Sequence, residues 1–238
     1  MINLPAIELA LRDLQRSFPQ INLELSDRRD PLDDEVLGNL LEGYRMVDRF
    51  LGDGVDIFKM GQLHYLPELN AVVLCGSDSA VRSLHHRLIE ATEARFYEQP
   101  SGGISDIMEW YALNIDKSVW HRAAGVYIRI LSDPQLFIEG NHRTGALIMS
   151  YLLARERCAP FVLTAKNARE FFNPSSVFKK TNKRSVLTRF KLPGLTSAFA
   201  DYLKSQANGS FLVSTKSSQV WPGEEVRSNR IIFGQDKS

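Results

Sequence analysis

The chain has 238 residues, of which 44% are hydrophobic and 24% are charged, and its formal net charge at pH 7 is +1. These values are typical of an ordinary globular protein, and they lack the strongly basic balance that nucleic-acid binding usually requires. No apolar run approaches the roughly 20 residues that cross a bilayer, so we expect neither a nucleic-acid partner nor a membrane anchor.

The N-terminus and the cysteines indicate a reducing compartment. Glu8, Arg12 and Asp13 interrupt the first apolar residues, which argues against a signal peptide. Cys75 and Cys158 lie in apolar surroundings and are predicted to be free thiols. The expected location is cytoplasmic, although an effector exported without a cleaved signal has the same features.

Two amphipathic helices are predicted in an N-terminal helical region, residues 1–55. The first covers residues 4–18, where apolar side chains recur at helical spacing. The second begins with Asp30 as its N-cap and Pro31 in its first turn. A Gly-Asp-Gly sequence at 52–54 ends it.

The next segment changes pattern and predicts a β-hairpin. Residues 61–65 and 71–75 alternate or run short and apolar, as strands do. The segment between them is a predicted turn, made of Leu66, Pro67, Glu68, Leu69 and Asn70.

Helical patterns then dominate a central domain, residues 56–205, and a C-terminal extension at 206–238 ends in a predicted strand at 230–233. The fold class is therefore mainly α with one hairpin, without the strand–helix alternation of a Rossmann sheet. We expect helices at 79–96, 104–114, 120–131, 144–155, 195–203, and a short one that ends at 172 before Asn173-Pro174.

Basic residues cluster between positions 179 and 191. A solvated helix face explains such a cluster, and a surface for phosphate or an acidic partner is the alternative. The residues are Lys179, Lys180, Lys183, Arg184, Arg189 and Lys191.

Polar residues concentrate in a loop, residues 134–145, between two predicted apolar helices. Backbone N–H groups at a helix N-terminus lack intrahelical acceptors, and the macrodipole adds partial positive charge there. The loop therefore predicts a phosphate site, although the chain has neither GxGxxG nor GxxxxGK[ST].

The sequence Phe-Ile-Glu-Gly-Asn-His-Arg-Thr at 137–144 resembles the loop H-P-F-x-[D/E]-G-N-[G/K]-R-x-x-R of the Fic family (the Fic/Doc, or Fido, fold). The helices from 79 to 203 are similar in order to the family's helical core, and the predicted hairpin lies where the family has its flap. The resemblance implies a Fido-like fold and an enzyme that transfers AMP from ATP, or a related group, to a protein hydroxyl. In that family the flap aligns the target segment by adding a strand to it.

Carried over residue by residue, the resemblance implies a Mg²⁺ ligand at Glu139 and a target-binding flap at 66–70. It also implies that a nucleotide such as ATP is held by the phosphate-binding residues Gly140, Asn141, His142, Arg143, Thr144 and Gly145.

Four positions depart from the family pattern. Gln135 stands at the catalytic His, and Leu136 at the following Pro; His142 replaces the second Gly, and Ala146 the final Arg. A neutral amide is a poor proton acceptor near pH 7, whereas imidazole titrates close to it. General-base catalysis contributes about 10²–10⁴-fold, so we expect phosphate binding with impaired AMP transfer.

His142 and Glu42 leave alternatives open. His142 is a candidate substitute base, an anion contact or a structural residue, and no pair among the five histidines has convincing zinc-ligand spacing. Glu42-Gly43 resembles part of the family's inhibitory helix motif [S/T]-x-x-x-E-[G/N], but Gly38 replaces the Ser or Thr. Glu42 is a relic of that motif or an ordinary glutamate on an amphipathic helix.

Three functions are compatible with these residues. The first is a pseudoenzyme that keeps nucleotide binding without conventional transfer. The second is an active nucleotidyltransferase of altered chemistry, in which His142 or the substrate assists. The third is a non-enzymatic interaction protein that uses the flap. A helix joint needs neither Glu139 nor Arg143, which favours the first two, and the missing His favours the first and third.

Overall fold

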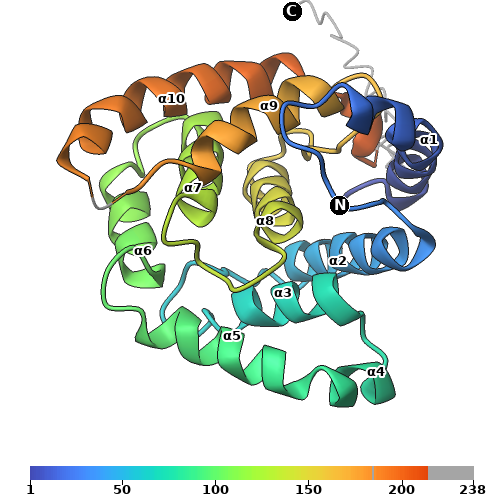
Figure 1. Cartoon of the computed structure of the whole chain (residues 1–238), viewed down its shortest axis with the longest axis horizontal. Helices are drawn as coiled ribbons and strands as arrows, with labels where there is room; N and C mark the ends of the chain where they lie inside the picture. Colours follow the sequence, from blue (N-terminus) through green and yellow to red (C-terminus); the bar gives the residue numbers. More distant parts are fainter. Residues whose placement is uncertain (184, 214–238) are drawn as a thin grey trace, which may run out of the picture.

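A computed structural model describes residues 1–183 and 185–213 of the chain, without the side chains of residues 186–189. The described part is mainly α, as predicted (Figure 1). Its elements are α1 (Leu4–Leu23), α2 (Asp34–Gly52), α3 (Tyr65–Cys75), α4 (Ser79–Leu84), α5 (His86–Glu98), α6 (Ile104–Leu113), α7 (Val119–Leu131), α8 (Asn141–Arg155), α9 (Ala168–Lys179), α10 (Val186–Ser205) and the short 3₁₀ helix η1 (Gly209–Phe211).

Helices α7 and α8 form the centre of the molecule, and the other helices surround them (Figure 1). Both carry buried side chains on nearly every face, as a fully enclosed helix does. Gly125 of α7 allows close packing, because a Cβ there would lie 1.9 Å from a ring atom of Trp110 on α6. The loop that joins α7 to α8 therefore connects two helices that are packed tightly in the core.

The N-terminal helices are confirmed, with different ends. The predicted apolar stripe of α1, from Ile7 to Phe18, is buried, and the helix continues through Pro19 to Leu23. Helix α2 begins at Asp34, because Asp33 is the N-cap: its carboxylate accepts the N–H of Val36 at 2.8 Å. The predicted start at Asp30 and Pro31 was therefore three residues early.

The predicted hairpin is wrong, because residues 65–75 form helix α3. The segment is apolar on all sides, and a short apolar run does not distinguish a buried strand from a buried helix. Pro67 lies in the first helical turn, where its missing N–H is not needed. Gly76, at φ 67°, ends the helix.

Two further helix predictions need correction. The segment 79–96 forms two helices, separated at His85, and Leu84 is 83% exposed where a buried apolar face was expected. Helix α9 runs through Pro174 to Lys179 instead of ending before it. Between residues 1 and 213, apart from residue 184, β-structure is limited to two isolated bridges, Ile2 with Leu212 and Asp133 with Asn182. The predicted strand at 230–233 lies outside the described residues.

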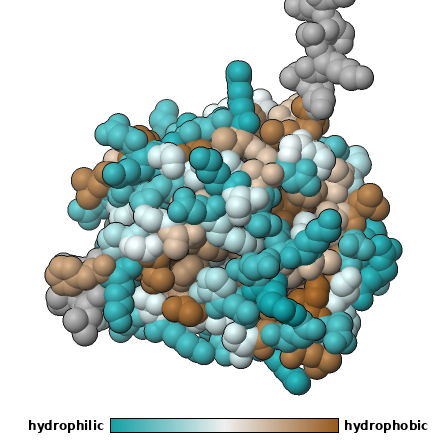
Figure 2. All heavy atoms as spheres, turned by 90° about the horizontal axis from the view of Figure 1, so that it is seen from above, coloured by the Kyte–Doolittle hydropathy of each residue, from teal (hydrophilic) through white to brown (hydrophobic). Residues whose placement is uncertain are grey.

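The surface and the thiols agree with the composition. Hydrophilic side chains cover much of the face seen in Figure 2, with apolar residues scattered between them. No helix in the described ranges combines the length and apolarity that a bilayer span needs. Cys75 and Cys158 are both free thiols, the first buried and the second half-buried.

Candidate functional site

The loop between α7 and α8 forms one wall of a cavity of about 580 Å³. The opposite wall comes from α1, α2 and the segment between them, and α9 contributes one side. The lining residues include an apolar group from α1, α2 and α9 and a polar group from the loop and from residues 28–30.

Two buried amides and one glycine fix the shape of the loop. The side chain of Asn141 accepts the N–H of Phe137 and donates to its carbonyl, both at 2.9 Å. Asn70 of α3 donates to the carbonyl of Glu139 at 3.0 Å and to the hydroxyl of Thr144 at 2.9 Å. Gly140 has φ 73°, and a Cβ there would lie 2.9 Å from Nδ2 of Asn70, so the turn needs glycine.

This turn leaves the first amides of α8 open. Thr144 donates its N–H to the carbonyl of Gly140 at 2.9 Å. The N–H groups of Asn141, His142 and Arg143 have no acceptor among the described residues. All three residues line the cavity, so the positive end of the helix dipole faces it.

Side-chain charge adds to this positive potential. Arg28, Arg29, Arg143 and Lys179 line the cavity with two carboxylates, Asp30 and Glu139. Four cations exceed two carboxylates, so the cavity favours an anion.

Arg143 is held in place at the cavity wall. Its Nη1 donates to the carbonyl of Val73 at 2.9 Å. Burial lowers its pKa, partly opposed by Asp30 and Glu139, but a guanidinium stays charged in proteins. Arg143 therefore remains a fixed cation with further N–H donors for an anion.

Glu139 is exposed at the same wall, and no cation pairs with its carboxylate within the described residues. No cluster of three or more His, Cys, Asp or Glu side chains is found there either. Mg²⁺ is commonly bound by one or two carboxylates together with substrate phosphates. Glu139 fits that pattern, with the ligand supplying the remaining oxygens.

Gln135 also lines the cavity, at the end of α7. Its Nε2 donates to the carbonyl of Leu131 at 3.3 Å, and its backbone carbonyl accepts two N–H groups of Arg95 at 2.8 and 3.2 Å. The amide side chain offers no basic nitrogen to a ligand in the cavity.

His142 belongs to a hydrogen-bond chain whose direction is determined. Arg29 Nη1 lies 3.2 Å from His142 Nε2, and because guanidinium only donates, Nε2 is the acceptor. His142 Nδ1 therefore carries the hydrogen and donates to the Tyr127 hydroxyl at 3.1 Å. That hydroxyl donates to Ser175 Oγ at 2.9 Å, and Ser175 donates to the carbonyl of Phe171 at 2.6 Å.

The protonated form of His142 is strongly disfavoured. Burial first, then the positive charges of Arg29 and Lys179, lower its pKa to about 3. Because Arg29 occupies the Nε2 lone pair, His142 has neither the pKa nor the free nitrogen of a general base. The geometry favours a structural role for this side chain.

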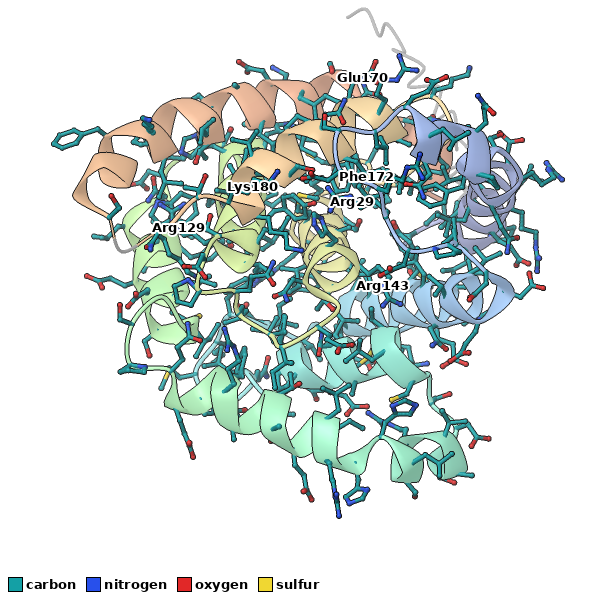
Figure 3. The ribbon with its side chains drawn as sticks, in the orientation of Figure 1. Arg29, Arg129, Arg143, Glu170, Phe172 and Lys180 are labelled. Atoms are coloured by element: carbon teal, nitrogen blue, oxygen red, sulfur yellow. The ribbon has the colours of Figure 1, made fainter. Side chains whose placement is uncertain are left out.

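Arg29 also docks the segment between α1 and α2 against α9. Its Nη2 donates to the carbonyl of Phe172 at 3.1 Å and to the hydroxyl of Ser176 at 2.7 Å. The guanidinium lies over the Phe172 ring at 5.2 Å, and Figure 3 shows the two side chains together.

Two predicted phosphate-binding residues do not reach the cavity. Thr144 is fully buried and its hydroxyl accepts from Asn70. Gly145 packs against the core, where a Cβ would lie 2.8 Å from the ring of Tyr127. The cavity wall includes Gln135 and the loop from Ile138 to Arg143, but not these two residues.

The segment predicted to be a target-binding flap is helical and does not form a strand. Leu66 and Leu69 are core residues of α3, Asn70 is committed to the loop, and Glu68 pairs with Arg82 at 2.8 Å. A helix uses its backbone donors and acceptors internally, so this segment offers no free strand edge. The residues concerned are Leu66, Pro67, Glu68, Leu69 and Asn70.

Glu42 lies on α2 outside the cavity lining. Its Oε2 is buried without a hydrogen-bond partner in the part of the chain that the structure describes. A Cβ on Gly76 would lie 3.5 Å from that oxygen. No arginine among the described residues pairs with it, and position 146 is Ala.

Sequence reasoning missed the contribution of the segment before α2. Arg28, Arg29 and Asp30 follow a stretch without helical period, and this loss of period was the only local signal. Lys179 was predicted as part of a basic cluster, but the residues of this cluster do not share one site. Lys179 lines the cavity, whereas Lys180 pairs with Asp27 at 3.0 Å on the surface.

Comparison with known proteins adds little. No protein-family model matches this chain, and no curated protein matches it significantly. Among solved structures it is similar to a Fic domain-containing signalling protein from Bacteroides thetaiotaomicron, with 16% identity, a TM-score of 0.41, and coverage of 86% of this chain and 98% of that one. At that score the likeness decides neither the family nor the activity of this chain.

Proposed function

We propose that the cavity binds a phosphate-bearing ligand, with a nucleotide such as ATP as the leading candidate. One observation carries the proposal: three open N–H groups of α8, those of Asn141, His142 and Arg143, face a cavity with an excess of cations. Donors that are already in place need no rearrangement to bind an anion, so the site is preorganised.

The other half of the cavity suits an apolar or aromatic body. Leu14, Phe18, Val36, Leu40 and Phe172 line it. A ligand with a charged group at one end and a flat ring at the other satisfies both halves. Inorganic phosphate satisfies only one, so we expect a nucleotide to bind more tightly than phosphate.

We propose that Mg²⁺ enters with the ligand and contacts Glu139. A bound Mg²⁺ would neutralise part of the negative charge of the phosphate groups. The protein contributes the carboxylate of Glu139, the guanidinium of Arg143 and the amides of α8. The resemblance of the loop to the Fic motif supports the same assignment of roles.

Conventional AMP transfer is impaired in this proposal, because no side chain of the loop accepts the hydroxyl proton. Gln135 has a neutral amide, and Nε2 of His142 is occupied by Arg29. Removing a general base costs about 10²–10⁴-fold in rate. The alternative is an active transferase in which a group of the substrate accepts the hydroxyl proton. An assay of AMP transfer distinguishes this alternative from the proposal.

Titration calorimetry with ATP, GTP, CDP-choline and phosphate, with and without Mg²⁺, tests binding. We expect Arg143→Ala to raise the dissociation constant for ATP at least about tenfold, since a charge-assisted hydrogen bond contributes about 1.5–3 kcal/mol to binding. Arg12→Ala is the matched control, because Arg12 pairs with Glu8 on the surface of α1. An absence of wild-type binding to all four compounds, or equal affinity in Arg143→Ala, would contradict the proposal.

Intact mass after incubation with labelled nucleotide tests transfer. We expect no auto-modification by the wild type, and no robust activity from Gln135→His alone, because Ala146 still lacks the arginine of the family motif. Auto-modification of the wild type would instead support the active transferase.

A further inference from the structure

A second cavity of about 510 Å³ lies on the opposite side of α7 from the first. Figure 3 shows Arg129 on the α6 side of α7, away from Arg29 and Arg143. The two cavities share no lining residue. The second is lined by Ser101, Gly102, Asp106, Ile107, Glu109, Trp110, Leu113, Arg129, Lys183 and Leu192.

Lys183 is a half-buried amine in this cavity. Its stem crosses Gly102 so closely that a Cβ on Gly102 would lie 2.8 Å from Lys183 Cε. Its Nζ donates to the backbone carbonyl of Arg129 at 2.8 Å. No carboxylate forms an ion pair with Lys183 within the described residues.

Burial lowers the pKa of Lys183 to about 7, although the nearby charges act in both directions. Arg129 on α7 and Arg95 on α5 lower it further, whereas Asp106 on α6 and Asp133 after α7 raise it. The lowered pKa increases the fraction of neutral amine at pH 7 over that of an ordinary lysine, whose pKa is about 10.4.

Arg129 is a cation that forms no ion pair with any residue that the structure describes. Its guanidinium lies over the Trp110 ring at 3.9 Å, and Nη1 donates to the carbonyl of Gly125 at 3.1 Å. Burial alone lowers its pKa, to about 10, so it stays charged at neutral pH. Nε and Nη2 have no acceptor among residues 1–183 and 185–213, so a planar carboxylate has two donors available.

Two acids line the same cavity. Asp106 accepts the N–H of Gly102 with Oδ2, and its other oxygen has no hydrogen-bond partner in the described structure. Glu109, one turn along α6, is exposed at the cavity wall. Either acid is placed to exchange protons with a reacting group between α6 and Lys183.

We propose that this cavity is a covalent site for a small oxo-carboxylate, in which Lys183 forms an imine with the carbonyl group and Arg129 binds the carboxylate. A cavity with an amine, a cation and an acid supplies the three contacts that such a ligand needs. Its apolar part, Ile107, Leu113 and Leu192, covers the carbon chain.

The condensation balances without an oxidant or a reductant. The lone pair of Lys183 forms a bond to the carbonyl carbon, and one N–H proton passes to the carbonyl oxygen through the carboxylate of Asp106 or Glu109, which gives a carbinolamine. The second N–H proton follows the same route to the hydroxyl group, which leaves as water while the C=N bond forms. The product is an imine and one water, and reverse addition of water releases the ligand.

Glyoxylate with sodium cyanoborohydride at pH 7 tests the proposal, because reduction traps the imine as a stable amine. We expect peptide mapping to find Lys183 labelled at least about tenfold above any exposed lysine, given its larger fraction of free amine, beside any label on the N-terminal α-amine. Peptide mapping of the wild type decides this without any variant. Equal labelling of Lys183 and exposed lysines such as Lys180 would overturn the proposal.

Variants then test each contact. Lys183→Arg should lose the adduct that maps to position 183, whereas Lys180→Arg, at an exposed position outside the cavity, should keep it. Arg129→Gln should lower the yield of the Lys183 adduct severalfold with glyoxylate and leave it unchanged with acetaldehyde, which has no carboxylate. A total adduct yield on lysine side chains that is equal in wild type and Lys183→Arg, or an equal effect of Arg129→Gln on both aldehydes, would overturn the assigned roles.

Discussion

Each of the two cavities contains a base whose pKa is lowered by burial, and the two bases differ in whether the nitrogen lone pair is occupied. His142 has its pKa lowered to about 3 and Lys183 to about 7, in both cases chiefly by burial. Arg29 donates to the His142 nitrogen, whereas Lys183 itself donates to a carbonyl. Burial lowers the pKa of both bases, but the hydrogen-bond partner determines whether the nitrogen lone pair is free to react.

The same comparison separates the ligands that the cavities suit. The first presents backbone amides and four cations from three segments of the chain, which matches a phosphate group. The second presents a stacked guanidinium and an amine, which matches a carboxylate beside a carbonyl.

The largest expected effect concerns Lys183 above neutral pH. The unfolded chain binds this proton below about pH 10.4, whereas the folded chain binds it only below about 7. Wild-type stability should therefore fall as pH is lowered from 10 to 7, by roughly 3–4 kcal/mol relative to Lys183→Met. Urea unfolding at both pH values measures this difference. Lys180→Met is the control and should follow the wild type, and parallel behaviour of Lys183→Met would contradict the burial of a neutral amine.

His142 should produce the corresponding effect below neutral pH. The unfolded chain takes up the proton near pH 6.5, but the folded chain does so only near 3. Stability should fall as pH is lowered from 6.5 to 4, by about 3 kcal/mol more in the wild type than in His142→Gln. Chemical unfolding at the two pH values tests this, with the exposed His85→Gln as the control. A wild type that lost no more stability than His142→Gln would show that His142 is accessible to protons.

Tyr127→Phe interrupts the chain that holds His142. The variant leaves Nδ1–H of His142 without its acceptor and Ser175 without its donor. We expect a loss of about 1–3 kcal/mol in the free energy of unfolding, which is the cost of an unpaired buried polar group. Tyr97→Phe, at a position 47% exposed, should change stability by less than about 0.5 kcal/mol. Equal stability of the two variants would refute the claim that the Tyr127 hydroxyl holds His142 in place.

Gly140→Ala should have the smallest effect on stability. A residue with a side chain at φ 73° costs about 1–2 kcal/mol, and the new Cβ would also press on Asn70. Gly38→Ala on α2 is the matched control: nothing lies within 4 Å of its Cβ, so it should stabilise the helix by about 0.4–1 kcal/mol. Thermal unfolding compares them, and a neutral Gly140→Ala would mean that the loop tolerates another conformation.

Local sequence signals predicted the parts of the molecule that depend on local structure. The stripe of α1 and the polar loop before α8 were recognisable, because helical period and helix N-terminal chemistry act over a few residues. Helix α3 was misassigned because its apolar run has no period: Leu66 and Leu69 are buried as they would be in a central strand.

The remaining site residues depend on tertiary structure. Arg29 reaches His142 across 113 positions, and Lys183 reaches Arg129 across 54. Neither pair leaves a periodic or motif signal in the sequence. The burial that lowers the pKa values of His142 and Lys183 likewise results from packing among several helices.

The hydrogen bonds of Arg29 make the first 33 residues part of the binding site. A chain trimmed to begin at residue 56 would lose Leu14, Phe18, Arg29 and Val36 from the cavity wall, and Nε2 of His142 would lose its only described donor. Such a fragment would expose an imidazole with a free nitrogen beside the open amides of α8. Residues 1–55 therefore supply both much of the apolar wall of the cavity and the donor that occupies Nε2 of His142.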